Sequence, residues 1–145
     1  MGLNGVLGIV VPIHADGVMH DIFHGKSVHA SLAQGERTDL ENGDRIFFYD
    51  SRTTHSIMGE AVIADISFEE ARNVLDDLGP KLYLDKHDFE VYVSSLPDGD
   101  KSRLRVLHFK DPILYASPVK CGLAISENGT YLTAEIFAKI VKGAV

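Results

Sequence analysis

The chain has one cysteine, no long apolar run and no excess of positive charge. The lone Cys121 excludes a disulfide within the chain and a multi-cysteine zinc site, and it indicates a reducing, cytoplasmic setting. The early uncharged stretch from Met1 to Ala15 is broken by three glycines, Pro12 and His14. It has no basic residues before it and falls short of the ~20 apolar residues of a membrane span. We therefore expect a cytoplasmic protein that does not enter a membrane.

Length and composition indicate one globular domain. The chain has 145 residues, of which 45% are hydrophobic and 24% charged, which is ordinary for a globular protein. A chain of this length buries enough surface to fold around a single core without a metal or a disulfide. We expect a single domain that spans residues 1–145.

The formal net charge is −7, which argues against a partner that is bound mainly through its phosphate backbone. The acidity is unevenly distributed, however. The stretch from Glu60 to Asp100 contains 11 acidic and three basic residues, so the rest of the chain is close to neutral. We expect most of this acidic stretch to form the solvated face of two helices, away from any binding cleft.

Hydrophobic patterning predicts strands and helices that do not alternate regularly. The expected strands are Val6–Val11, Lys26–Leu32, Arg45–Tyr49, Ile57–Ile66, Arg103–Phe109 and a short one within Val119–Ile125. The expected helices are Asp16–Gly25, Phe68–Leu78, Asp85–Leu96 and one that follows Thr133. Ser67 and Glu70 have the spacing of a capping box, Asn42-Gly43 predicts a turn, and Gly59 predicts a bulge. This order predicts an α+β fold with a mostly antiparallel or mixed sheet.

Four of the seven histidines lie close together in the sequence: His14, His20, His24 and His29. His20 and His24 share one face of the expected helix, a spacing that can hold a metal from one side. The HExxH pattern is absent, and surface histidines that flank an apolar stripe explain the same spacing. We expect no metal and no cofactor.

Signals for nucleophilic catalysis are few. Cys121 follows Lys120, a neighbour that would lower a thiol pKa, but an inert cysteine explains the position as well. The hydroxyl side chains around His55 are explained by a hairpin connection. We assign no catalytic residue from these patterns.

Basic and aromatic residues around the apolar strands suit contacts with phosphates and stacking on bases. Lys26, Arg45 and Arg52 lie near Tyr49 and Ser51, and Lys101, Arg103 and Arg105 alternate along one expected strand. Scattered cations of this kind are also typical of an ordinary solvated surface.

An ordered series of short motifs resembles the PUA-like superfamily. The motifs are Ile22-Phe23-x-Gly25-Lys26-x-Val28, Leu40-x-x-Gly43-Asp44-x-Ile46-x-Phe48-Tyr49-x-Ser51 and Gly59-Glu60-Ala61-x-Ile63. The match continues through Tyr92, Tyr115-x-x-Pro118-Val119 and Gly129-x-Tyr131-Leu132-Thr133, and it looks closest to an uncharacterised archaeal family of that superfamily.

The resemblance implies a mixed β pseudobarrel with flanking helices, in which ASCH and EVE relatives bind RNA or a modified base in a cleft beside the first helix. It places six residues at or near that cleft: Lys26, His29, Arg45, Tyr49, Ser51 and Arg52. Lys26 and the arginines would contact phosphates or carbonyls, and Tyr49 and His29 would stack on a base or contact its edge.

Some ASCH relatives are amidohydrolases that act on a modified cytidine, with a Lys, a Thr and a Glu. Where these enzymes have their Lys and their Thr nucleophile, this chain has Ser27 and Ala30. The nucleophile is therefore missing from its expected place. We therefore predict binding of RNA or a modified nucleotide without chemistry. Two alternatives remain open: a small hydrolase that uses His29, Ser31 or Glu60, and a protein-binding module that uses the acidic helices.

Overall fold

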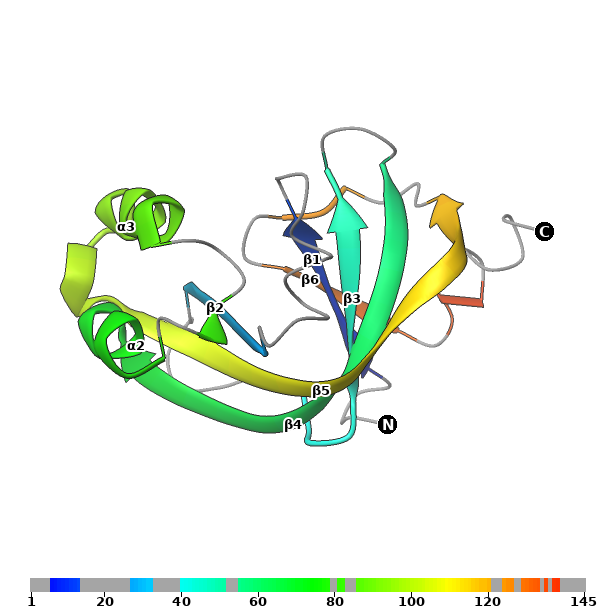
Figure 1. Cartoon of the computed structure of the whole chain (residues 1–145), viewed down its shortest axis with the longest axis horizontal. Helices are drawn as coiled ribbons and strands as arrows, with labels where there is room; N and C mark the ends of the chain where they lie inside the picture. Colours follow the sequence, from blue (N-terminus) through cyan, green and yellow to red (C-terminus); the bar gives the residue numbers. More distant parts are fainter. Residues whose placement is uncertain are drawn as a thin grey trace.

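The computed structural model describes residues 6–13, 27–32, 40–51, 55–78, 81–82, 86–120, 124–126, 129–133, 135 and 137–138. Six strands form one sheet in the order β2-β5-β4-β3-β1-β6 (Figure 1). The strands are β1 (Val6–Ile13), β2 (Val28–Leu32), β3 (Arg45–Asp50), β4 (Ser56–Glu70), β5 (Arg103–Lys120) and β6 (Thr130–Thr133). The helices with assigned bounds in the described residues are α2 (Ala71–Leu78), α3 (Lys86–Ser94) and the 3-10 turn η3 (Gly99–Lys101), and residues 135, 137 and 138 are also helical.

The sheet is mixed, as the sequence predicted, and the helices α2 and α3 accompany it. β1 and β3 run parallel, and the other pairs are antiparallel. The long strands β4 and β5 curve together from the helices to the far side of the molecule (Figure 1). In the described part of the chain, the end strands β2 and β6 do not pair with each other, so the expected pseudobarrel is not closed by strand pairing.

The two faces of the sheet carry separate apolar clusters. One face, which we call the central face, buries Ile9, Ile46, Ile63 and Leu107 in one cluster. The opposite or reverse face buries Val10, Phe47 and Ile57 beside Phe137 at one end of the sheet. At its other end, the reverse face packs Val28, Ala30, Leu104 and Val106 against α2 and α3. Because side chains alternate along a strand, these clusters fix which face each polar residue occupies.

The predicted helix start at Ser67 is wrong. Residues Ser67–Glu70 continue β4, where Ser67 pairs with Val106 of β5, and α2 begins at Ala71. The ladder to β5 supplies the backbone hydrogen bonds that a capping box would otherwise supply. Ala71 and Val74 then turn into the core beside β5.

Two strands continue past the prolines that were expected to end them. Pro12 lies within β1 beyond the last residue that pairs with β6, and β5 continues through Pro112 and Pro118 to Lys120. In the described chain Pro12 pairs with β3 alone, and Pro112 and Pro118 lie where the register between β4 and β5 shifts, so the missing N–H groups interrupt no regular ladder. Of the predicted strand Val119–Ile125, residues 119–120 end β5, residues 124–126 are not strand, and residues 121–123 lie outside the described residues.

The predicted turn at Asn42-Gly43 is confirmed and sets the start of β3. Gly43 has a φ of +96°, and the Glu41 N–H donates to the Asp44 Oδ2 at 2.8 Å. The register also shifts beside Gly59, which confirms the predicted bulge. In the described residues, no helix is long and apolar enough to cross a membrane.

Candidate functional site

Three polar residues are buried together on the central face of the sheet. Ser31 of β2 pairs with Arg105 of β5, and His29 pairs with Leu107 one step along. The exposed fractions are 6% for His29, 1% for Ser31 and 7% for Arg105. The Arg105 Nη2 donates a hydrogen bond to the Ser31 Oγ at 3.2 Å. A guanidinium, an imidazole and a hydroxyl therefore share one buried position beside the end strand β2.

A tyrosine from the other end strand completes this group. The Arg105 Nη1 donates to the Tyr131 hydroxyl of β6 at 3.2 Å, and the guanidinium carbon lies 5.8 Å from the centre of the Tyr131 ring. That distance is within the range of a cation–π contact. Arg105 therefore connects the two end strands of the sheet, β2 and β6, through side-chain hydrogen bonds. Tyr131 is 36% exposed, so the group reaches the surface.

Tyr92 of α3 reaches the same place from the helices. Its hydroxyl accepts a hydrogen bond from the backbone N–H of Leu32 at 2.8 Å, at the end of β2. It also favours the charged form of Arg105 electrostatically. We call the five residues His29, Ser31, Tyr92, Arg105 and Tyr131 the Arg105 cluster.

Burial sets the charge states in the cluster. Loss of hydration, and secondarily the charge of Arg105, lowers the pKa of His29 from 6.5 to about 3. The imidazole is therefore neutral at physiological pH and offers one donor and one acceptor. Burial also lowers the pKa of Arg105, while Tyr131 and Tyr92 oppose the shift. A guanidinium stays protonated in proteins, so the cluster combines a fixed positive charge with neutral polar groups.

Residues 6–134 match the sequence model of a domain family of unknown function, DUF365. The chain belongs to the DUF365 family. No curated protein matches the chain significantly.

Several solved structures share the fold of this DUF365 domain. A serine-to-alanine variant of the ASCH protein from Zymomonas mobilis matches with a TM-score of 0.73 and 15% identity, over 97% of this chain and 99% of that one. The unsubstituted protein matches with a TM-score of 0.69 and 16% identity, over 94% of each chain. The N-terminal domain of McrB from Staphylothermus marinus matches with a TM-score of 0.54 and 14% identity, over 98% of this chain and 99% of that one. These matches support the ASCH-like, PUA-like fold that the sequence motifs indicated.

The DUF365 domain does not bring the described members of the predicted site together. His29 lies on the central face within the Arg105 cluster. Arg45 and Tyr49 belong to the reverse face, because they alternate with Ile46 and Phe48 of the central cluster. Lys26 and Arg52 lie outside the described residues, as do His14, His20 and His24.

The other predicted residues have local partners. Arg45 forms an ion pair with Glu60, and the Tyr49 hydroxyl lies 3.4 Å from the Nδ1 of His55. The Ser51 Oγ donates to the Ile13 carbonyl at 3.1 Å, which ties the ends of β3 and β1 together. Glu60 lies on the reverse face, whereas His29 and Ser31 lie on the central face. The three residues considered for hydrolysis are therefore not assembled into one site.

Sequence reasoning noticed Arg105 but did not find its role. The alternation placed Lys101, Arg103 and Arg105 on one side of a strand. Lys101 instead belongs to η3, and in β5 Arg103 is exposed whereas Arg105 is buried. The difference comes from β2, which pairs with Arg105 through Ser31, a contact 74 residues away in the chain. The signal that was available is the pattern His29-x-Ser31, which places polar side chains on the same face of an otherwise apolar strand.

Proposed function

We propose that this DUF365 domain binds RNA or a modified nucleotide in the gap between β2 and β6, and that this gap is the cleft of a PUA-like pseudobarrel. One observation carries the proposal. The buried Arg105 hydrogen-bonds to Ser31 of one end strand and Tyr131 of the other, at a point where Tyr131 reaches the surface. The resemblance to ASCH and EVE relatives that bind RNA or a modified base supports the same cleft.

The chemistry of the Arg105 cluster suits a single base with its phosphate. Single-stranded RNA is recognised by unstacked bases that lie against aromatic rings and hydrogen-bond through their edges. Neutral His29 offers both a donor and an acceptor to a base edge, and Arg105 suits a phosphate or a carbonyl oxygen. Tyr131 offers an aromatic ring at the mouth of the gap. We assign edge contact to His29, anion or carbonyl contact to Arg105 and stacking to Tyr131.

Of the residues that the sequence assigned to binding, the proposal places His29 in the site. Lys26 immediately precedes Ser27 at the start of β2, so we propose it as a phosphate contact, with Arg52 as a second one. Arg45, Tyr49 and Ser51 have partners on the reverse face or at the end of β3, and we do not assign them to the same base.

Fluorescence anisotropy with a labelled single-stranded RNA and a labelled RNA hairpin tests the proposal. Arg105→Lys keeps the charge but loses the planar fork, and we expect affinity to fall about tenfold or more. Tyr131→Ala removes the stacking ring and should weaken binding by about tenfold, since stacking on a base is worth roughly 1–3 kcal/mol.

Arg103→Gln is the matched control, because it removes a cation two residues along the same strand from an exposed position. It should change affinity less than about threefold. A thermal melt of each variant separates lost binding from lost fold. The proposal is wrong if neither RNA binds, or if folded Arg105→Lys and Tyr131→Ala bind like the unsubstituted protein.

A further inference from the structure

A small cavity lies on the reverse face of the sheet. It has a volume of about 220 Å³ and is lined by Ile57, Glu60, Tyr115, Val119 and Phe137. Four of these residues present apolar or aromatic surface, and Glu60 supplies the one carboxylate. We call this cavity the Glu60 pocket. Because it opens on the face opposite His29 and Arg105, it is separate from the site proposed above.

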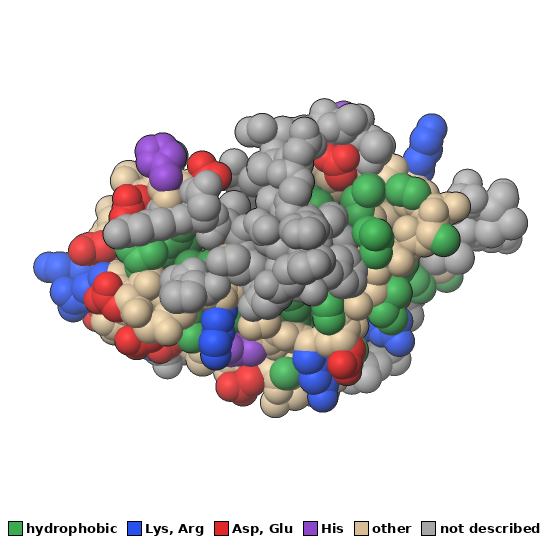
Figure 2. Space-filling model, viewed as in Figure 1, with side chains coloured by type: hydrophobic (Ala, Val, Ile, Leu, Met, Phe, Trp, Pro, Cys, Tyr) green, Lys and Arg blue, Asp and Glu red, His purple; other side chains and the backbone are tan. Residues whose placement is uncertain are grey.

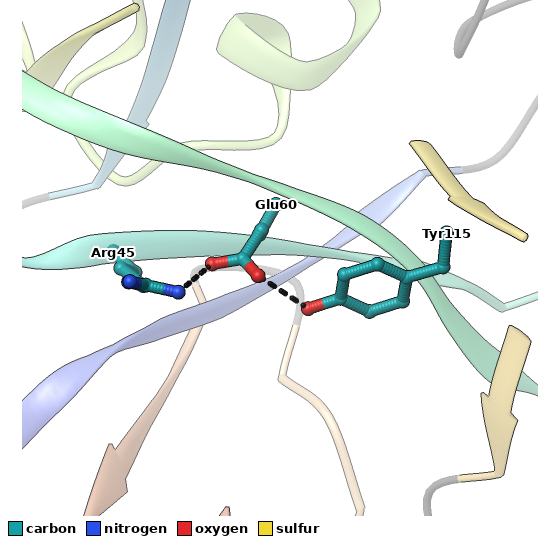
Figure 3. A network of polar contacts seen from close by, with 3 residues as sticks. All are labelled: Arg45, Glu60 and Tyr115. Carbon is teal, nitrogen blue, oxygen red and sulfur yellow. Dashed lines mark hydrogen bonds and ion pairs between the residues drawn. The ribbon is translucent and has the colours of Figure 1, made fainter. Parts of the chain in front are cut away.

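The Glu60 carboxylate is held from two sides. The Arg45 Nη1 contacts its Oε2 at 2.5 Å, and the Tyr115 hydroxyl donates to its Oε1 at 3.2 Å (Figure 3). The Glu60 side chain is 14% exposed, whereas that of Arg45 is 51% exposed. Arg45 therefore neutralises the carboxylate from the solvent side, and Tyr115 fixes it from within the sheet.

Tyr115 acts as a donor in this arrangement. Burial, and then the charge of Glu60, raises the pKa of its phenol well above the usual range. The hydroxyl therefore stays protonated and donates to the carboxylate. An ionised carboxylate has about four acceptor positions, and the contacts of Arg45 and Tyr115 use two of them. The carboxylate retains the capacity to accept N–H groups from a ligand.

Charge and size restrict the class of ligand that the Glu60 pocket can bind. A second cation in the pocket would be repelled by Arg45, so an uncharged N–H donor suits the Arg45–Glu60 pair better. The volume of about 220 Å³ lies below the roughly 300–1,000 Å³ of pockets for drug-sized molecules. A single ring fills such a space.

The walls favour a flat ring. The rings of Tyr115 and Phe137 line the pocket together with the aliphatic Ile57 and Val119. Aromatic side chains pack favourably against other aromatic rings in stacked or edge-to-face arrangements. We propose that the Glu60 pocket binds a small, uncharged heteroaromatic ring that carries an amino group, with the amino N–H groups donating to the Glu60 carboxylate.

The test uses 2-aminopyrimidine as the probe and 2-methylpyrimidine as its control, which has a similar size and ring but no N–H. Titration of the full chain, followed by protein NMR shifts, should show saturable binding of 2-aminopyrimidine at residues of β4 and β5 around the pocket. The methyl compound should bind about tenfold more weakly or not at all, because it makes no hydrogen bond to the charged acceptor.

Three variants locate the site. Glu60→Gln replaces one acceptor oxygen with an amide and should weaken binding of 2-aminopyrimidine about tenfold. Val119→Leu leaves the carboxylate in place and should exclude the ring by filling the pocket. Glu69→Gln is the control, since this glutamate is on β4 but does not line the pocket, and it should leave binding unchanged.

The proposal is overturned if no saturable binding occurs, if both compounds bind equally, or if Glu60→Gln and Val119→Leu bind like the unsubstituted protein. These results do not depend on RNA binding, because the Arg105 cluster lies on the other face. Loss of RNA affinity in Arg105→Lys, with the probe still bound, would separate the two sites directly.

Discussion

At the residue scale, Arg105 determines how the polar groups of the central face are arranged. Its guanidinium reaches hydroxyls on two strands that are not neighbours in the sheet. A buried charge is costly unless hydrogen bonds accompany it, so these contacts stabilise the charge and also fix its direction. Neutral His29 beside it avoids a second buried charge.

Tyr131→Phe tests the contribution of the hydroxyl. The substitution removes the hydrogen bond from Arg105 but keeps the ring, and we expect a loss of about 1–2 kcal/mol in the free energy of unfolding. Tyr131→Leu should lose about 0.5–1 kcal/mol more, because it also removes the cation–π contact. Urea denaturation measures both. A double-mutant cycle with Arg105→Met isolates the pair, and a coupling near zero would contradict the assigned contact.

The pH dependence of stability tests the charge state of His29. Its pKa is about 3 in the folded protein, below the ordinary value of 6.5. The unfolded chain therefore binds a proton first, and stability falls as the pH drops from 6.5 toward 3. By pH 4.5 about 3 kcal/mol of this stability is lost, at 1.36 kcal/mol per pH unit. Above pH 6.5 the contribution is fully present.

His29→Asn is the comparison, because it keeps a polar group and does not titrate. The difference in unfolding free energy between the two proteins, measured in urea from pH 7.5 to pH 4.5, should change by about 3 kcal/mol. The carboxylates titrate equally in both proteins, so their effect cancels in the difference between the two unfolding free energies. A constant difference across this range would mean that His29 is solvated in the folded state.

At the element scale, the sequence predicted where the strands lie better than the residues at which they begin and end. Val6–Val11, Arg45–Tyr49 and Arg103–Phe109 lie within the observed strands β1, β3 and β5. Periodicity is a local signal and identifies such segments. The ends of β4 and β5 depend on how the two strands pair, with Glu70 opposite Arg103, and that contact cannot be derived from either segment alone.

The same reason explains why the candidate site was only partly predicted. The sequence identified His29, but its face is set by pairing with Leu107, 78 positions later. The resemblance to PUA-like proteins also placed Arg45 at the same cleft as His29. Their opposite faces emerge only once β2 has paired with β5 and β3 with β4. Long-range register is the missing information.

Ser67→Val distinguishes the strand from the helix start that the sequence indicated. In β4, Ser67 pairs with Val106, and a β-branched residue suits this position. We expect the unfolding free energy to stay within about 0.5 kcal/mol or to rise. Loss of an N-cap would cost about 1 kcal/mol instead. Ser102→Val is a useful contrast, because Ser102 is buried and its hydroxyl accepts a hydrogen bond from the Asp98 N–H.

At the scale of the whole molecule, the acidic charge extends beyond the helices. Acidic side chains are frequent at the end that carries α2 and α3, whereas hydrophobic side chains are frequent on the opposite end (Figure 2). The sequence assigned the acidic stretch mainly to two helices, but Glu60, Asp65, Glu69 and Glu70 belong to β4. The acidity therefore extends along the sheet toward the centre of the molecule, so it also limits how closely a polyanion approaches the proposed cleft.

This charge distribution predicts a weak dependence of RNA binding on salt. The proposed contacts of Arg105, Lys26 and Arg52 would neutralise about two or three phosphates. The slope of log affinity against log salt for single-stranded RNA is then about −1.5 to −2. Anisotropy titrations from 50 to 400 mM NaCl measure the slope, and a long RNA duplex should compete poorly. A slope steeper than about −4, or strong competition by the duplex, would indicate a broad basic surface instead of a cleft for one nucleotide.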